Sequence, residues 1–174
     1  MTTEQNAVVN DTSGAILGLL TIEGSMCGND LWTVAGKWLA PYFPVTRSQV
    51  YRELKAMEKR GLVREGKMIP KGGLTYKITA AGKKALSEWY NTAYSLDTFR
   101  NTVALRVAFA QVTGRANLEA VATSARKAHE EEIVKLEALI KEAASKELHD
   151  DALALAFALS YHRAAITWLD TIKS

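Results

Sequence analysis

The sequence predicts a mainly α-helical protein in two parts. Apolar residues recur with a helical period in seven stretches, whereas only residues 62–65 and 74–78 have the character of β-strands. The chain has 3 prolines and 48% hydrophobic residues, which favours helices around a packed core. The pattern changes near Asp97, so we predict an N-terminal domain over residues 1–96 and a helical domain over residues 97–174.

The first two predicted helices lie before the prolines of the N-terminal part. Thr12 or Ser13 is expected to cap a mostly buried helix from Gly14 to about residue 23. A second helix begins with Gly28 or Asn29 near its cap. Two prolines at positions 41 and 44 then end it, because the residue before a proline avoids the helical region.

The stretch from residue 45 to residue 79 combines a basic helix with a hairpin. Thr46 is a good cap for a helix over residues 47–60, in which Val50, Leu54 and Met57 form an inward stripe. Two short strands should follow, joined by a flexible tip over residues 66–73. This order predicts a winged helix-turn-helix, with the basic helix as recognition helix and the hairpin as wing.

A fourth helix should complete the N-terminal domain. Thr79 is expected to cap it, and the helix should run to about Leu96. Its predicted buried residues are Ala81, Ala85, Leu86, Trp89 and Tyr90.

Positive charge is concentrated on the stretch that holds the helix and hairpin. Residues 47–84 contain eleven Lys and Arg but three Asp and Glu, a net charge of +8. Residues 97–174 contain ten basic and eleven acidic residues, a net charge of −1. Such a patch is typical of a nucleic-acid surface, although charge alone fits an ordinary solvated face equally well.

The type and spacing of the outward residues favour double-stranded DNA as the partner. A major groove about 12 Å wide admits one α-helix, in which Gln49 can pair with adenine and Arg52 with guanine. Thr46 and Ser48 can reach phosphate at the helix N-terminus, and wing lysines can contact the backbone. The predicted DNA-binding residues are Thr46, Arg47, Ser48, Gln49, Tyr51, Arg52, Lys55, Lys67, Lys71 and Lys77.

The second half predicts three helices that pair two copies of the chain. We expect them to begin at Thr98, after a cap at Asn117, and after a cap at Asp150 or Asp151. From Ile133 the apolar spacings match a helix–helix seam. The last helix is apolar over more surface than one neighbour covers, which predicts a homodimer. The predicted dimerisation residues are Phe157, Tyr161, Ile166, Trp168 and Leu169.

No pattern in the chain indicates an enzyme, a cofactor or a metal site. The single Cys27 excludes a cysteine-based zinc site, and we expect it to be a buried residue near a helix start. His129, His149 and His162 lie on separate helices or a turn, without metal-ligand spacing. No glycine-rich loop has the spacing of a phosphate-binding loop.

Four tryptophans raise the question of a small-molecule effector. Core packing explains them best, and the alternative is a pocket for a small aromatic or drug-like effector near Trp38 or Trp89. No signal peptide and no run of about 18 apolar residues is evident, so we expect a cytoplasmic, nucleoid-associated protein without membrane contact.

Several segments resemble the PadR family of transcriptional regulators. The resemblance is to the subgroup with a long helical C-terminal domain related to the virulence activator AphA. It covers nearly the whole chain from Gly14, and the matching segments are residues 15–20 (AILGLL), 28–31 (GNDL), 50–63 (VYRELKAMEKRGLV) and 76–82 (YKITAAG), with Tyr161, Trp168 and Leu169 in the final helix.

The resemblance implies a bacterial regulator, usually a repressor, that binds a palindromic operator as a dimer. Small aromatic or drug-like effectors release some members. The chain departs from the family at Cys27 and Asn29, where a histidine and a tyrosine are frequent, and in its wing, which has lysines where arginines are frequent. The alternative function is a winged-helix protein-interaction module without sequence-specific DNA binding, for which the acidic residues 130–132 would serve a partner.

Overall fold

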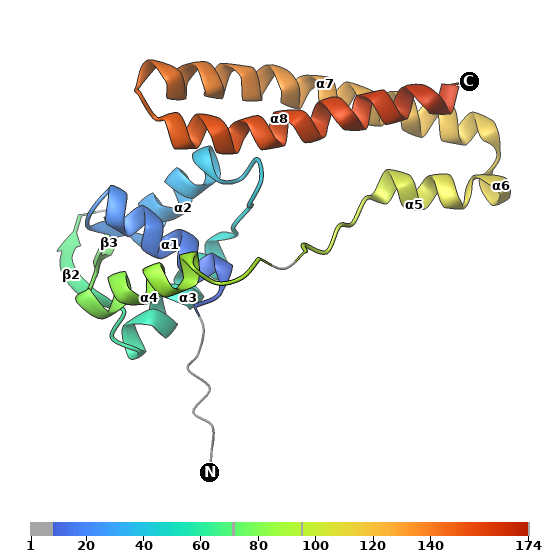
Figure 1. Ribbon diagram of the computed structural model, residues 1–174. Helices are drawn as coiled ribbons and strands as arrows, with labels where there is room; N and C mark the ends of the chain where they lie inside the picture. The colour runs from blue at the N-terminus through green and yellow to red at the C-terminus, as the bar shows by residue number, and fades with distance from the viewer. Residues whose placement is uncertain (1–8, 71, 95, 174) are drawn as a thin grey trace, which may run out of the picture. The chain divides into compact units, whose positions relative to one another are not determined.

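The computed structural model describes residues 9–70, 72–94 and 96–173, and its chain divides into two compact units (Figure 1). The units are Met1–Ser95 and Leu96–Ser174. Lys71, one of the predicted DNA-binding residues, lies outside the described residues.

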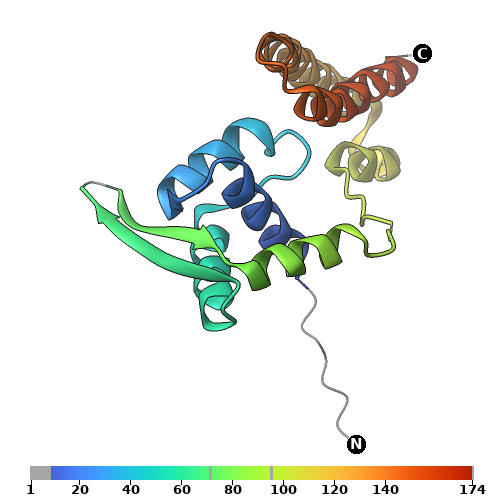
Figure 2. The ribbon, with the colours of Figure 1, turned by 60° about the vertical axis from the view of Figure 1, so that its left-hand side comes forward.

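The first unit packs four helices with a small antiparallel sheet. Its helices are α1 (Asp11–Ile22), α2 (Gly28–Trp38), α3 (Arg47–Lys59) and α4 (Ala80–Tyr90). Its strands are β1 (Met26–Cys27), β2 (Val63–Ile69) and β3 (Gly73–Ile78), in the order β1-β3-β2. Strands β2 and β3 form a long hairpin that projects from the helices (Figure 2). The helical content and the hairpin confirm the predicted winged-helix fold class.

Helix α1 begins three residues earlier than predicted. Asn10 is the N-cap, and its Oδ1 accepts a hydrogen bond from the Ser13 amide at 2.8 Å. Ser13, one of the two predicted caps, is instead a buried residue inside the helix. Ser13 was a candidate because a serine hydroxyl is a good cap, but this hydroxyl instead donates to a distant partner, Glu53.

Cys27 caps helix α2 in place of the predicted Gly28 or Asn29. Its Sγ accepts a hydrogen bond from the Asp30 amide at 3.4 Å, and the residue is fully buried. Cys27 also pairs with Thr75 in the sheet, through the two-residue strand β1. That strand was not predicted, because two residues are too few to show alternation.

The predicted cap and inward stripe of α3 are confirmed. Thr46 is the N-cap, and the three inward residues Val50, Leu54 and Met57 are each at most 1% exposed. These residues join the core of the first unit with residues from α1, α2, β2 and β3. Glu53, a charged residue on the same helix, is also buried, with 7% of its surface exposed.

The hairpin is longer than predicted and its tip is shorter. Strand β2 runs on to Ile69, with an irregularity in the pairing between Glu65 and Met68. At that irregularity the Thr75 hydroxyl donates to the Lys67 carbonyl at 2.9 Å. Lys67 therefore lies in a strand, whereas the glycines around it predicted a loop.

Helix α4 begins at the predicted cap but ends at Tyr90, well before Leu96. The Thr79 hydroxyl accepts from the Gly82 amide at 3.0 Å. A side chain at Gly82 would lie 2.1 Å from the Leu62 carbonyl oxygen, so only glycine allows α4 to approach the hairpin this closely. Tyr90 is 81% exposed and Ala81 is exposed, so neither belongs to the predicted buried side.

The second unit is built on two long antiparallel helices. Its helices are α5 (Thr102–Ala108), α6 (Ala110–Thr113), α7 (Arg115–Ser145) and α8 (His149–Asp170), followed by a 3₁₀ turn over Thr171–Lys173. Helices α7 and α8 lie side by side along most of their length (Figure 1). The three predicted starts shift, because Asn101 caps α5, Gly114 precedes α7, and α8 begins at His149.

The seam between α7 and α8 follows the predicted spacing. Leu136 and Ala143 are at most 2% exposed, and Leu155 and Leu159 are buried residues of α8. Ile133 and Ile140 are half-buried. By length and composition alone, helix α8 is also long and apolar enough to cross a membrane, although no run of about 18 apolar residues was evident in the sequence.

Candidate nucleic-acid interface

Helix α3 presents an exposed polar row on the side away from its core stripe. Ser48, Arg52, Lys55 and Lys59 are exposed and follow one another at spacings of four, three and four residues. Residues with these spacings share one face of a helix. The row therefore brings two lysines and an arginine to the solvent side of α3, as the sequence predicted.

Gln49 is held differently from the prediction. Its Oε1 accepts hydrogen bonds from the Thr46 amide and the Thr46 hydroxyl, each at 2.8 Å, while the Thr46 hydroxyl accepts from the Gln49 amide at 3.2 Å. This is a capping box, which satisfies amide groups at the start of α3. The Gln49 side chain is thus turned back along the helix and half-buried, and pairing with a base would break the cap.

The side chain of Arg47, in the first turn of α3, lies beside two aromatic rings. Its guanidinium carbon lies 5.9 Å from the centre of the Trp32 ring on α2 and 5.8 Å from the Tyr51 ring. Tyr51 in turn packs over Gly28, where a side chain would lie 2.6 Å from the ring. Such contacts orient an arginine while its charge stays available, because Arg47 remains exposed.

Arg52 is linked to a buried carboxylate that also holds the start of α1. Its Nε lies 3.3 Å from Glu53 Oε1, while Glu53 Oε2 accepts from the Ser13 hydroxyl at 2.8 Å and from Asn10 Nδ2 at 3.1 Å. Burial by itself raises the pKa of Glu53, but the hydrogen bonds from Ser13, Asn10 and Arg52 and the Arg52 charge outweigh it, so the pKa is lowered. The carboxylate therefore stays ionised.

The hairpin adds three exposed basic residues. Arg64 and Lys77 are directly opposite each other on β2 and β3, and Lys67 follows on β2. Opposed residues of a strand pair lie on the same face of the sheet, so Arg64 and Lys77 form one basic patch. Arg64 was missing from the predicted residues, although its alternation with the buried Val63 was a usable signal.

The two tryptophans predicted near an effector are engaged in packing. The Trp89 Nε1 donates to Asp11 Oδ1 at 2.9 Å, and its ring covers Gly14 of α1. Trp38 is half-buried, with the Lys37 ammonium 4.7 Å from its ring centre.

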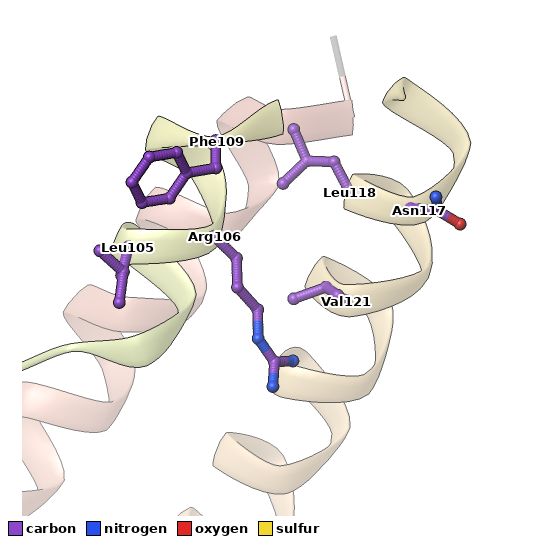
Figure 3. A pocket seen from close by; sticks show the side chains of 6 residues that line it. All are labelled: Leu105, Arg106, Phe109, Asn117, Leu118 and Val121. Atoms are coloured by element: carbon purple, nitrogen blue, oxygen red, sulfur yellow. The ribbon is translucent and has the colours of Figure 1, made fainter. Parts of the chain in front are cut away.

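A hollow of about 450 Å³ lies instead between α5 and α7 in the second unit (Figure 3). Its walls are mostly apolar, and Arg106 extends between the two helices beside Val121 (Figure 3). The lining residues are Leu105, Arg106, Phe109, Asn117, Leu118 and Val121.

The predicted dimerisation residues separate into exposed and internal ones. Phe157 is 69% exposed and Tyr161 is 36% exposed, whereas Leu169 is 2% exposed. Leu169 packs with Ala122 and Ile172 of its own chain, with Trp168 beside them, so its side chain is buried within the chain. Leu153, which was not among the predicted residues, is also 73% exposed, one turn before Phe157.

The C-terminal unit matches a known family. Residues 99–174 match the family described as virulence activator alpha C-term. Among curated protein sequences, none matches the chain.

Several solved structures are similar to nearly the whole chain. Bacillus subtilis PadR in complex with operator DNA has a TM-score of 0.82 at 21% identity, over 94% of this chain and 97% of that one. The same protein in complex with p-coumaric acid has a TM-score of 0.70 at 21% identity, over 94% and 95%. The Vibrio cholerae virulence activator AphA has a TM-score of 0.75 at 21% identity, over 93% and 95%. The chain therefore has the fold of the PadR-like regulators, and its C-terminal unit is similar to the family described as virulence activator alpha C-term.

Proposed function

We propose that this protein is a DNA-binding transcriptional regulator, with α3 as recognition helix and the β2–β3 hairpin as wing. The observation that carries the proposal is the exposed row Ser48, Arg52 and Lys55 on a capped helix, next to a hairpin with Arg64 and Lys77 on one face. The similarity in fold to PadR, which was solved with operator DNA, supports it. The relatives are regulators, so we also propose that the protein is no enzyme and works in the cytoplasm at the nucleoid.

Helix α3 is expected to bind in the major groove of DNA. An α-helix enters the major groove with its N-terminal residues against the bases, and wing cations contact phosphates. Arg52 is the candidate base reader, because a guanidinium can donate two bonds to guanine. Gln49 is assigned to the cap instead, so we expect fewer direct base contacts than the sequence predicted.

Substitution of Arg52 and of Lys67 should separate sequence reading from phosphate contact. Arg52→Ala is expected to lose about 1–3 kcal/mol of preference for a duplex selected from a random library by the wild-type protein. Lys67→Ala should weaken binding to every duplex about equally and reduce the slope of log affinity against log salt by about 1. Fluorescence anisotropy at several salt concentrations measures both effects.

Arg100→Ala is the matched control, since Arg100 is an exposed arginine of the second unit. It should leave the sequence preference unchanged. Unchanged preference in Arg52→Ala would remove α3 from the role of recognition helix. Salt-independent or undetectable binding of the wild type would favour the alternative, a protein-interaction module.

We further propose that the regulator is a homodimer and a repressor at a palindromic operator. Two recognition helices related by a two-fold axis would reach successive major grooves, about 34 Å apart. The exposed apolar stripe Leu153, Phe157 and Tyr161 on α8 supports this assembly, since its residues are four positions apart and leave apolar surface uncovered.

The hollow between α5 and α7 is the proposed effector site. Apolar walls and the Arg106 guanidinium suit a small aromatic molecule with an anionic group. PadR, of similar fold, was solved with p-coumaric acid. Titration with p-coumaric acid is expected to release the selected duplex from the wild-type protein, and Arg106→Gln should require a higher concentration. Equal release from both proteins would place the effector elsewhere.

A further inference from the structure

The guanidinium of Arg52 is held on one side by a buried carboxylate of the same helix. Its Nε donates a hydrogen bond to Glu53 Oε1 at 3.3 Å. The side chain of Arg52 is 69% exposed, whereas that of Glu53 is 9% exposed. Consecutive residues of a helix do not face each other, so this contact fixes the direction in which the Arg52 side chain lies on the surface of α3.

Glu53 cannot follow a movement of Arg52, because its second oxygen is bound to another helix. Glu53 Oε2 accepts hydrogen bonds from the Ser13 hydroxyl at 2.8 Å and from Asn10 Nδ2 at 3.1 Å. Asn10 is fixed in turn, since its Oδ1 caps α1 by accepting from the Ser13 amide at 2.8 Å. The carboxylate is therefore anchored to the start of α1 and offers its other oxygen at a set place beside α3.

The contact leaves most of the guanidinium available to a ligand. A guanidinium has five N–H donors in a rigid planar fork, of which Glu53 takes the one on Nε. The four donors on the two Nη atoms remain, and guanine presents two acceptors, O6 and N7, in the major groove. A long side chain loses rotamer freedom when it binds, and a side chain that is already ordered loses less.

We infer that Glu53 is a positioning residue that determines sequence preference through Arg52, by presenting its guanidinium to a guanine in the major groove. This role rests on the proposed function, in which α3 is the recognition helix and Arg52 its base reader. Ser13 and Asn10 act one step further away, because they hold the carboxylate rather than the guanidinium. The start of α1 thereby contributes to sequence reading without touching DNA.

Glu53→Met in the full-length chain tests this role, because methionine keeps the length of the side chain and offers Arg52 no oxygen. The probes are the duplex that the wild type selects from a random library and a duplex changed at the base pair that Arg52→Ala no longer distinguishes. Glu53→Met should reduce the preference between these duplexes roughly 2–10-fold, as expected for the cost of ordering one long side chain. In an Arg52→Ala background it should cause no further loss. Fluorescence anisotropy measures the preference, with the folded fraction fixed by stoichiometric titration.

Ser13→Ala is the matched control. It removes a hydrogen bond to the same carboxylate but leaves the Asn10 contact and the Arg52 contact in place. This variant should be less stable than the wild type and should keep the sequence preference. If Glu53 only joined α1 to α3, the two variants would change the preference alike, and that outcome would overturn the positioning role.

Nuclear magnetic resonance of the DNA-free wild type tests the same role even if Glu53→Met fails to fold. The Nε–H signal of Arg52, identified by its loss in Arg52→Ala, should show restricted picosecond-to-nanosecond motion in a heteronuclear Overhauser experiment. The signal of Arg100, an exposed arginine of the second unit, should show free motion. Equal mobility of the two arginines would overturn the positioning role.

The proposed function and the positioning role fail in different ways. A wild type that binds all duplexes equally would contradict the proposed function and leave Glu53 nothing to position. A preference that depends on Arg52 and survives in Glu53→Met would overturn the positioning role alone.

Discussion

Deletion of residues 150–174 is expected to leave a protein that no longer forms a folded dimer. Helix α8 is the main partner of α7 in the second unit, and its removal uncovers Leu136 and Ala143 together with Ala122, all at most 2% exposed in the intact chain. A 31-residue helix without a partner face has little stability in water, because tertiary packing supplies most of it. Light scattering after size exclusion should show monomer or aggregate.

A milder variant separates loss of the fold from loss of the dimer. Leu153→Gln combined with Phe157→Gln changes two exposed side chains of α8 and leaves the buried Leu155 and Leu159 in place. We expect this variant to keep its helical circular dichroism and to become monomeric. Lys84→Gln, an exposed change in the first unit, should stay dimeric. A folded dimer after the deletion would contradict the role given to α8.

Glu53→Gln is expected to lower the free energy of unfolding by about 1–3 kcal/mol at pH 7. In the wild type, the buried carboxylate accepts hydrogen bonds from Ser13, Asn10 and Arg52. The glutamine amide is itself a donor and cannot accept at both of its terminal atoms, so at least one of these partners loses its bond. Because Ser13 and Asn10 belong to the start of α1, the loss loosens the contact between α1 and α3.

The same substitution should change how stability depends on pH. The pKa of Glu53 is lowered below its ordinary value of 4.5 in the folded state. The unfolded chain therefore binds more protons in this range, and the contribution of Glu53 is complete above pH 4.5 and declines as the pH falls through the folded pKa. Urea denaturation followed by tryptophan fluorescence should show wild type and Glu53→Gln converging at acid pH.

Glu88→Gln is the control for this effect, because Glu88 is an exposed carboxylate on α4 whose ion pair with Lys84 lies at the surface. Its stability should stay within about 0.5 kcal/mol of the wild type at each pH. A constant difference between wild type and Glu53→Gln from neutral to acid pH would mean that the folded carboxylate has no special stabilisation.

The sequence by itself determined the features that depend on residues close in the chain. The caps Thr46 and Thr79 are local, as is the stripe Val50, Leu54 and Met57, because a helix repeats every 3.6 residues and its first amides need nearby acceptors. The hairpin and the helix–helix seam beginning at Ile133 were likewise visible, because their apolar residues recur at the spacing of a strand and of a helix, respectively. Together they were enough to predict the winged-helix fold class and a helical second half.

Only the tertiary structure decided which polar side chains meet across helices. Nothing near Glu53 in the sequence shows that the Ser13 hydroxyl donates a hydrogen bond to it. Nothing near His129 shows that its ring nitrogen contacts that of His162. Cys27 became a cap because the sheet places it there, and Leu169 became internal because α7 covers it. Such contacts join residues that are 33 or more positions apart in the sequence. Local periodicity carries no information over that distance, because the packing of whole helices and strands decides which residues meet.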